Sequence, residues 1–130
     1  METTNERKRV LIVDDESGFT RLLKLTLERT GKYTVREQND ATHALETARE
    51  FRPDLALLDI MMPKMDGGDV ARQIKADPSL KQTRIVFLTA IVSQKEGTGT
   101  NMIGGFPFMA KPVSLDALVK CIEENLAAPA

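Results

Sequence analysis

Five short runs rich in apolar residues recur along the chain and constrain its fold more than any other feature. Residues 10–13 and 85–88 contain no polar side chain. A strand with one solvent-exposed face would alternate apolar and polar residues, so these runs indicate strands buried on both faces, as in a parallel sheet. Residues 33–37 are of mixed polarity and suit a sheet edge. The five predicted strands cover residues 10–13, 33–37, 54–58, 85–88 and 106–110.

Segments with helical periodicity separate most of these strands. Apolar residues recur at helical spacing after the first, second, third and fifth runs. Ser17, Asp40 and Ser114 each stand where a side chain can cap a helix start. The segment between the fourth and fifth runs differs, because it contains Gly97, Gly99 and two further glycines at 104–105. Each glycine inside a helix costs about 1 kcal/mol relative to alanine, so we expect a helix there to be short, late-starting or mobile.

The alternation of strands and helices predicts an α/β fold, a doubly wound five-stranded parallel sheet with helices on both faces. Right-handed crossovers then bring the carboxyl ends of all strands to one edge of the sheet. A length of 130 residues fits one domain. We expect the domain to cover residues 8–127, with flexible termini at 1–7 and 128–130.

Composition narrows the functional classes. The net charge of −1 gives no reason to expect nucleic-acid binding. The single cysteine, Cys121, rules out an internal disulfide and fits a reducing compartment. The chain has no apolar segment near the roughly 20 residues that span a bilayer, and its polar first nine residues do not form a signal peptide. We therefore expect a cytoplasmic domain with no membrane association.

Polar side chains follow four of the predicted strands. The apolar run at 54–58 leads directly into Asp59, and a buried carboxylate is costly without a partner. Ligands bind open α/β sheets at the carboxyl edge, where the strand order reverses. The candidate residues at this edge are Asp14 and Asp15 after the first strand, Asp59 after the third, Thr89 after the fourth and Lys111 after the fifth.

These residue types indicate a phosphoryl site. Three carboxylates in one pocket repel each other unless a cation lies between them, and a set of oxygen ligands favours Mg²⁺. Lys111 can pair with a phosphoryl oxygen, and Thr89 offers a hydroxyl donor. Asp59 would be the nucleophile that forms an aspartyl phosphate.

Each residue also has a purely structural interpretation. The acidic run that begins at Asp14 could cap the first helix. Thr89 could be a turn residue, and Lys111 with Pro112 could form a surface loop. The pair Met61 and Met62 could simply fill the core. The conjunction of compatible groups at four strand ends favours the functional interpretation.

Four motifs in order resemble the receiver domain of two-component response regulators, over about residues 8–126. They are Val-Asp-Asp-Glu at 13–16, Leu-Leu-Asp-Ile-Met-Met-Pro-Lys-Met-Asp-Gly at 57–67, Phe-Leu-Thr-Ala at 87–90 and Met-Ala-Lys-Pro at 109–112. The resemblance implies a flavodoxin-like sheet with strand order 2-1-3-4-5. It also implies a two-component signalling protein with Mg²⁺ as its cofactor.

The resemblance implies a role for each candidate residue. A histidine kinase or phosphotransfer protein would phosphorylate Asp59. Asp15, Asp59 and the backbone carbonyl of Met61 would bind Mg²⁺ directly, with Asp14 assisting through water. Thr89 and Lys111 would contact the phosphoryl group, and the Lys111–Pro112 bond would be cis. Phe108 takes the place of the family's switch aromatic, although a plain core aromatic is the alternative.

The function implied is a phosphorylation-operated switch rather than an enzyme. Its signalling face would comprise the fourth helix, the fifth strand and the last helix, acting on an unknown output partner. Homodimerisation through the last helix is left open. Apolar Met61 and Ile91, two residues beyond Asp59 and Thr89, imply slow self-dephosphorylation.

Two alternatives belong to other classes. A phosphatase with an aspartate nucleophile, of the haloacid dehalogenase type, would need an aspartate as acid/base at position 61. The residue there is Met61, which argues against this alternative. A pseudo-receiver would act as a scaffold independently of phosphorylation.

Overall fold

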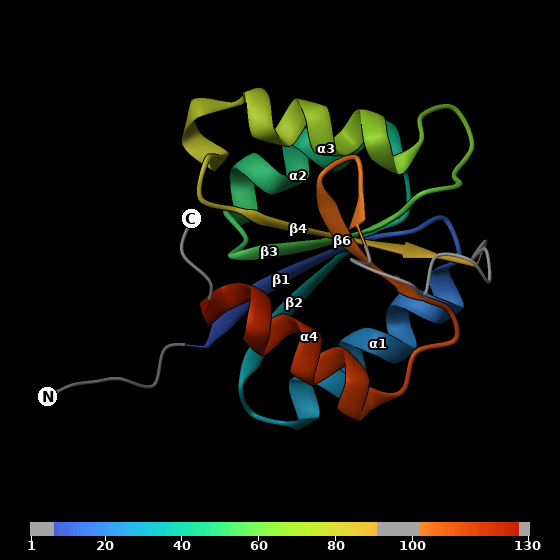
Figure 1. Ribbon diagram of the computed structural model, residues 1–130, viewed down its shortest axis with the longest axis vertical. Coiled ribbons are helices and arrows are strands. Elements are labelled where there is room, and N and C mark those ends of the chain that lie inside the picture. The colour runs from blue at the N-terminus through green and yellow to red at the C-terminus, as the bar shows by residue number, and fades with distance from the viewer. Residues whose placement is uncertain (1–6, 91–101, 128–130) are drawn as a thin grey trace, which may run out of the picture.

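The computed structural model describes residues 7–90 and 102–127. These residues form a twisted sheet covered by helices on both faces (Figure 1). The strands are β1 (Lys8–Val13), β2 (Tyr33–Gln38), β3 (Leu55–Asp59), β4 (Arg84–Thr89), β5 (Met102–Ile103) and β6 (Phe106–Ala110). The α-helices are α1 (Ser17–Arg29), α2 (Ala44–Phe51), α3 (Gly67–Ala76) and α4 (Leu115–Ala127). Two 3-10 helices, η1 (Ala41–His43) and η2 (Pro78–Leu80), precede α2 and follow α3.

The sheet has the order β2-β1-β3-β4-β6-β5. Its first five strands are parallel, so the predicted order 2-1-3-4-5 is confirmed, with β6 as the fifth parallel strand. The five predicted parallel strands are all present, and β5, which was not predicted, adds a short sixth strand antiparallel to β6. Gly104 and Gly105 allow this hairpin, since their φ angles of 58° and 88° are accessible to glycine at little cost. The helix expected between the fourth and fifth parallel strands falls on residues 91–101, outside the described residues.

Alternate residues of the central strands pack against different helices, because successive side chains of a strand point to opposite faces. In β1, Leu11 and Val13 belong to the core under α2 and α3, while Val10 and Ile12 belong to the core under α1 and α4. All four side chains are fully buried. Burial on both faces explains why these strands show no polar alternation in the sequence.

The predicted helix caps were correct at two starts and wrong at one. The Asp40 carboxylate accepts a hydrogen bond from the Thr42 amide at the start of η1, and the Ser114 hydroxyl accepts one from Ala117 at 3.1 Å. Ser17 does not cap α1; it is the first residue of the helix, and Glu16 occupies the cap position. In residues 7–90 and 102–127, no helix combines the length and apolar character needed to cross a membrane.

Candidate functional site

The acidic residues meet where β1 and β3 end side by side. The register of these strands pairs Val13 with Leu58, so the residues that follow, Asp14 and Asp59, emerge next to each other. One carboxylate oxygen from each of Asp14, Asp15 and Asp59 lies within 4.8 Å of the others. Asp14 and Asp59 are buried and Asp15 is exposed. The sheet edge therefore brings the three predicted carboxylates together.

Asp59 lies in an environment that disfavours its charged form. Its exposure is 6%. Burial and the neighbouring Asp14 carboxylate raise the pKa of Asp59 to about 6, although Lys111 and the Met61 backbone amide act in the opposite direction. Three carboxylates with one close ammonium leave excess negative charge in the pocket. A cation between them would favour ionised Asp59.

Lys111 reaches into this pocket from the end of β6. Its Nζ lies 2.7 Å from Asp14 Oδ2, 3.8 Å from Asp59 Oδ1 and 3.6 Å from Glu16 Oε1. The ammonium also lies 4.4 Å from the centre of the Phe19 ring. Burial opposes the charged form of Lys111, but the hydrogen bond and charge of Asp14 raise its pKa. The surface-loop interpretation of Lys111 is therefore wrong, since its side chain is 15% exposed and ion-paired.

A cavity of about 250 Å³ opens above these groups, lined by Asp15, Glu16, Asp59, Met61, Ala90 and Lys111. Thr89, just before Ala90, is the last residue of β4 and is 2% exposed. Met61 is 61% exposed at the rim, so the core interpretation of this methionine was wrong. Phe108 lies away from the cavity, since it pairs with Phe87 in the sheet and packs on the core beneath α2 and α3.

The start of α3 presses against the backbone of Asp59. The Gly67 amide donates to the Ile60 carbonyl at 3.0 Å. A Cβ atom added to Gly67 would lie only 2.4 Å from the Asp59 carbonyl oxygen. Only glycine permits so close an approach of helix and strand end. A capping box between Asp66 and Asp69 fixes the first turn of α3 at this point.

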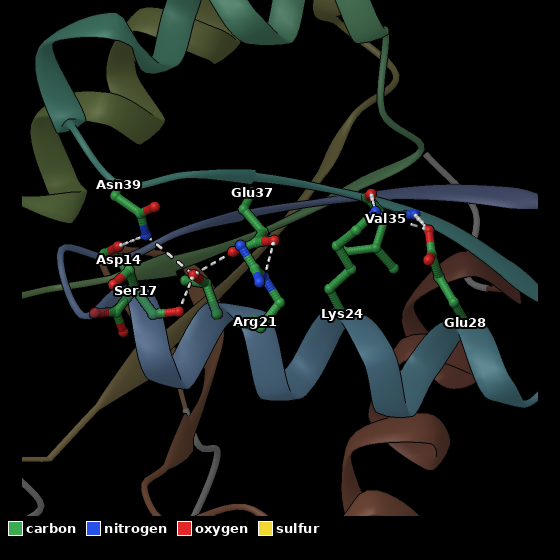
Figure 2. Close-up of polar contacts among 9 residues, drawn as sticks. Asp14, Ser17, Arg21, Lys24, Glu28, Val35, Glu37 and Asn39 are labelled. Carbon is green, nitrogen blue, oxygen red and sulfur yellow. Dashed lines mark hydrogen bonds and ion pairs between the residues drawn. The ribbon is translucent and has the colours of Figure 1, made fainter.

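The amide, the carbonyl and both carboxylate oxygens of Asp14 all form hydrogen bonds. Its amide donates to the Gln38 carbonyl at 3.2 Å, and its carbonyl accepts from Asn39 Nδ2 at 2.7 Å. Its Oδ1 accepts from the Glu16 amide at 2.9 Å, while Oδ2 accepts from Lys111. Figure 2 shows Asn39 above the turn after β1 and a chain of contacts that continues along α1 and β2. Asp14 thus both shapes the start of α1 and faces the pocket.

Three contributors to the site were not predicted from the sequence. Glu16 and Phe19 flank the Lys111 ammonium, and Asn39 holds the Asp14 carbonyl. Glu16 belongs to the acidic run after β1, so its sequence position gave a signal. Phe19 matches the apolar stripe of α1, and Asn39 is an ordinary loop residue in the sequence. Their contacts to residues far along the chain are visible only in the fold.

The donor set fits a hard divalent cation. The groups that converge are carboxylate oxygens, which Mg²⁺ prefers, and the described part of the chain places neither histidine nor cysteine among them. Burial first, and the Asp14 carboxylate second, raise the pKa of Asp59, and a cation beside the carboxylate would favour its ionised form. The triad Asp14, Asp15 and Asp59 could therefore hold Mg²⁺ next to a lysine suited to a phosphoryl oxygen.

Comparisons with known proteins agree with this geometry. The family model described as "Response regulator receiver domain" matches residues 10–123. The solved structure of the chemotaxis protein CheY4 of Vibrio cholerae superimposes with a TM-score of 0.79 at 27% identity. That match covers 92% of this chain and 99% of the CheY4 chain.

Two curated relatives differ in length. The chain is 31% identical over 119 residues to the polar-differentiation response regulator DivK of Brucella anthropi, covering 92% of this chain and 96% of DivK. It is 35% identical over 131 residues to the alkaline phosphatase synthesis transcriptional regulatory protein PhoP of Bacillus subtilis, covering 94% of this chain and 52% of PhoP. The chain therefore spans about half the length of PhoP.

Proposed function

The chain belongs to the response regulator receiver domain family, and on that premise we propose that Asp59 accepts a phosphoryl group from a histidine kinase or phosphotransfer protein. Receiver domains are signalling switches rather than enzymes. The observation that carries the proposal is the position of Asp59 at the end of β3, in a cavity that it shares with Asp15 and Lys111.

We assign the cation site to Asp14, Asp15, Asp59 and the backbone carbonyl of Met61. The first three converge within 4.8 Å, and Met61 lines the same cavity. Bound Mg²⁺ would supply positive charge to the pocket and to the oxygens of the incoming phosphoryl group. It would also favour the ionised form of Asp59, which the pocket alone opposes.

In the proposed transfer, an Asp59 carboxylate oxygen forms a bond to phosphorus while the bond from phosphorus to the donor histidine nitrogen breaks. The donor imidazole leaves with that electron pair. Lys111 lies 3.8 Å from Asp59 Oδ1, so its ammonium can offset charge on the phosphoryl oxygens. Its pairing with Asp14 holds the ammonium at the pocket beforehand.

The proposed output is a change in surface that follows phosphorylation. Thr89 would bond to the phosphoryl group and Phe108 would respond to the movement of the loop after β4. The signalling face would include β6, α4 and the helix expected in residues 91–101, which are outside the described residues. We propose a cytoplasmic location, because the single cysteine, Cys121, is free and fits a reducing compartment.

Intact-mass measurement after incubation with acetyl phosphate and Mg²⁺ tests the central step. The wild-type protein should gain the mass of one phosphoryl group, and excess EDTA should abolish the gain. Asp59→Asn should gain nothing, whereas Asp116→Asn, at an exposed aspartate in the first turn of α4, should behave as wild type. An equal mass gain in Asp59→Asn would overturn the proposal, and no gain in any protein would favour a scaffold that functions without phosphorylation.

Met61 bears on the lifetime of the phosphorylated state. Its side chain lines the cavity and offers no polar group that could orient an attacking water. We expect slow self-dephosphorylation, and a several-fold faster mass loss in Met61→Asn after acetyl phosphate is removed. An unchanged or longer lifetime in this variant would contradict the expectation.

A further inference from the structure

We propose that Asn39 is a positioning residue for the cation site. Its side chain holds the peptide between Asp14 and Asp15 in place and thereby raises the affinity of the site for Mg²⁺. The inference rests on the proposed function, because it concerns the same cation site. Asn39 is the first residue after β2, the strand that lies beside β1. Among the described residues, its hydrogen bond to the site goes to the main-chain carbonyl of Asp14 (Figure 2).

The Asn39 amide group uses both of its hydrogens at this point. Nδ2 donates to the Asp14 carbonyl at 2.7 Å and to Thr20 Oγ1 at 3.0 Å. The two bonds tie the end of β1 to the first turns of α1. The side chain therefore bridges the two elements that flank the aspartate turn.

A second layer of contacts fixes the direction of these bonds. Thr20 is fully buried, and its Oγ1 lies 2.8 Å from Glu37 Oε1 and 3.1 Å from the Ser17 carbonyl. A hydroxyl has one hydrogen, and the nearer, charged carboxylate is the stronger acceptor. Thr20 thus donates to Glu37 and accepts from Asn39. Arg21 Nε pairs with the other Glu37 oxygen at 3.3 Å.

The result is a directional chain from Arg21 through Glu37, Thr20 and Asn39 to the Asp14 carbonyl. That carbonyl belongs to the peptide bond that carries Asp15. Since Asp15 is exposed, its carboxylate depends on the backbone for its position. Loss of the Asn39 hydrogen bond frees this peptide to rotate. The conformational entropy lost when the cation orders the peptide again then lowers the binding affinity. Mutation of residues that hydrogen-bond to metal ligands and orient them typically lowers metal affinity 10- to 100-fold.

Mg²⁺ titration followed by backbone amide NMR tests the inference on the full chain. The amides of residues 14–16 and 59–61 report on the site, and ionic strength is held constant with NaCl. Asn39→Ala should raise the Mg²⁺ dissociation constant about tenfold. Thr20→Val should also raise the Mg²⁺ dissociation constant. Thr20→Ser, which keeps the hydroxyl, should bind Mg²⁺ as tightly as wild type.

Two matched controls remove the same kind of bond elsewhere. Asn125 Nδ2 donates to the Cys121 carbonyl at 2.8 Å in α4, and Thr26 Oγ1 bonds the Leu22 carbonyl at 2.6 Å in α1. Asn125→Ala and Thr26→Val should leave Mg²⁺ affinity unchanged. A separate readout is phosphorylation by acetyl phosphate, where Asn39→Ala should need about tenfold more Mg²⁺ for half its maximal rate but reach the wild-type rate at saturation.

The outcomes separate the two proposals. Failure of the wild-type protein to show saturable shifts would overturn the cation site itself. A wild-type protein that titrates, with Asn39→Ala binding Mg²⁺ equally well, would overturn the positioning role alone. Equal weakening by Asn39→Ala and Asn125→Ala would also overturn it, because the effect would then be general destabilisation. A lower rate in Asn39→Ala at saturating Mg²⁺ would contradict positioning through the cation.

Discussion

Gly67 shows how tightly single residues constrain the site. A methyl group at this position would lie 2.4 Å from the Asp59 carbonyl oxygen and 3.1 Å from the Ile60 Cα. Both contacts are to backbone, so no side-chain rotation can relieve them. The first residue of α3 and the last residue of β3 are therefore held at a separation that only glycine allows.

Gly67→Ala should destabilise the protein by about 1–3 kcal/mol, the usual cost of an added group in a closed space. It should also slow phosphorylation by acetyl phosphate about tenfold or more, because the Asp59 carboxylate is displaced. Urea unfolding and the time course of mass gain measure the two effects. Gly18→Ala is the control, since nothing lies within 4 Å of the added methyl group; it should stabilise α1 by about 0.5 kcal/mol. Equal stability of Gly67→Ala and wild type would contradict this account.

Asp77 is the residue whose titration is most clearly tied to the fold. Its carboxylate accepts from Arg49 Nε at 2.6 Å and from the amide and hydroxyl of Ser79. These bonds, that from Arg49 foremost, lower the pKa of Asp77 from 3.8 to about 2. They link α2 to the start of η2, far along the sequence.

A lowered folded-state pKa means that the unfolded chain binds the proton more tightly. The contribution of Asp77 to stability is therefore fully present above pH 3.8 and is lost as the pH falls through about 2. Asp77→Asn should be less stable than wild type at pH 5, and the gap should narrow as the pH approaches 2. Urea unfolding at several pH values measures the gap. A gap that is constant over this range would show that the charge of Asp77 plays no part.

At the scale of elements, α1 does more than cover the sheet. β2 is an edge strand, and outward-facing peptide groups on such an edge need partners. Lys24 Nζ donates to the Val35 carbonyl at 2.9 Å, and Glu28 Oε2 accepts from the Val35 amide at 3.0 Å (Figure 2). The two side chains also pair with each other at 3.2 Å. Side chains one helical turn apart on α1 thus replace a neighbouring strand at this point.

Glu28→Met should cost about 1–2 kcal/mol, because it leaves the Val35 amide without its charged acceptor. Amide hydrogen exchange at Val35 should accelerate about tenfold, while Glu46→Met, at an exposed residue of α2, should leave it unchanged. The Val35 bond is the main reason that the pKa of Glu28 lies below its usual 4.5. Hydrogen exchange in wild type and variants should therefore be compared above pH 4.5, where the Glu28 carboxylate of the wild type is charged in both the folded and the unfolded state. Unaltered protection of Val35 would exclude the clamp.

Elements with strong local patterns could be predicted from the sequence, and those without could not. The uninterrupted apolar runs of β1, β3 and β4 reflect burial on both faces. β5 has only two residues, which is too short for any period, and it forms because the turn at Gly104 and Gly105 folds it onto β6. Asp40 was predictable as a cap because its bond reaches only two residues along the chain.

The candidate site divides in the same way. Asp14 and Lys111 directly follow strands and Asp59 is the last residue of one, so topology alone brings them to one edge. Asn39 and Phe19 act through contacts to Asp14 and Lys111 across the fold. Nothing in their neighbouring residues distinguishes an asparagine that holds a turn from one that faces solvent. Sequence reasoning therefore found the carboxylates and the lysine of the candidate site but not the residues that contact them from other elements.

At the scale of the whole molecule, two cores on opposite faces of one sheet depend on each other. Neighbouring residues of each central strand contribute to both cores, as Leu57 and Leu58 do in β3. Loss of either helical layer would expose the other side of the same strands. We expect cooperative unfolding in a single transition, with the candidate site at the sheet edge formed only when both layers are in place.

The boundaries of this cooperative unit predict which fragments of the chain should fold. The buried members of both cores fall between Val10 and Ile122, and β1 begins at Lys8. A fragment of residues 8–127 should match the full chain in free energy of unfolding within about 0.5 kcal/mol, since surface changes seldom exceed that. It should also be phosphorylated to the same extent.

A fragment of residues 8–114 loses α4 and, with it, Leu118 and Ile122, both fully buried. Removing a side chain of this kind costs about 2–5 kcal/mol, so two together approach the entire stability of a small domain. This fragment should not fold, and circular dichroism with urea titration distinguishes the two fragments. A loss above about 1 kcal/mol in the 8–127 fragment would place part of the folding unit outside these boundaries. Cooperative unfolding of the 8–114 fragment would show that the core under α1 is stable without α4.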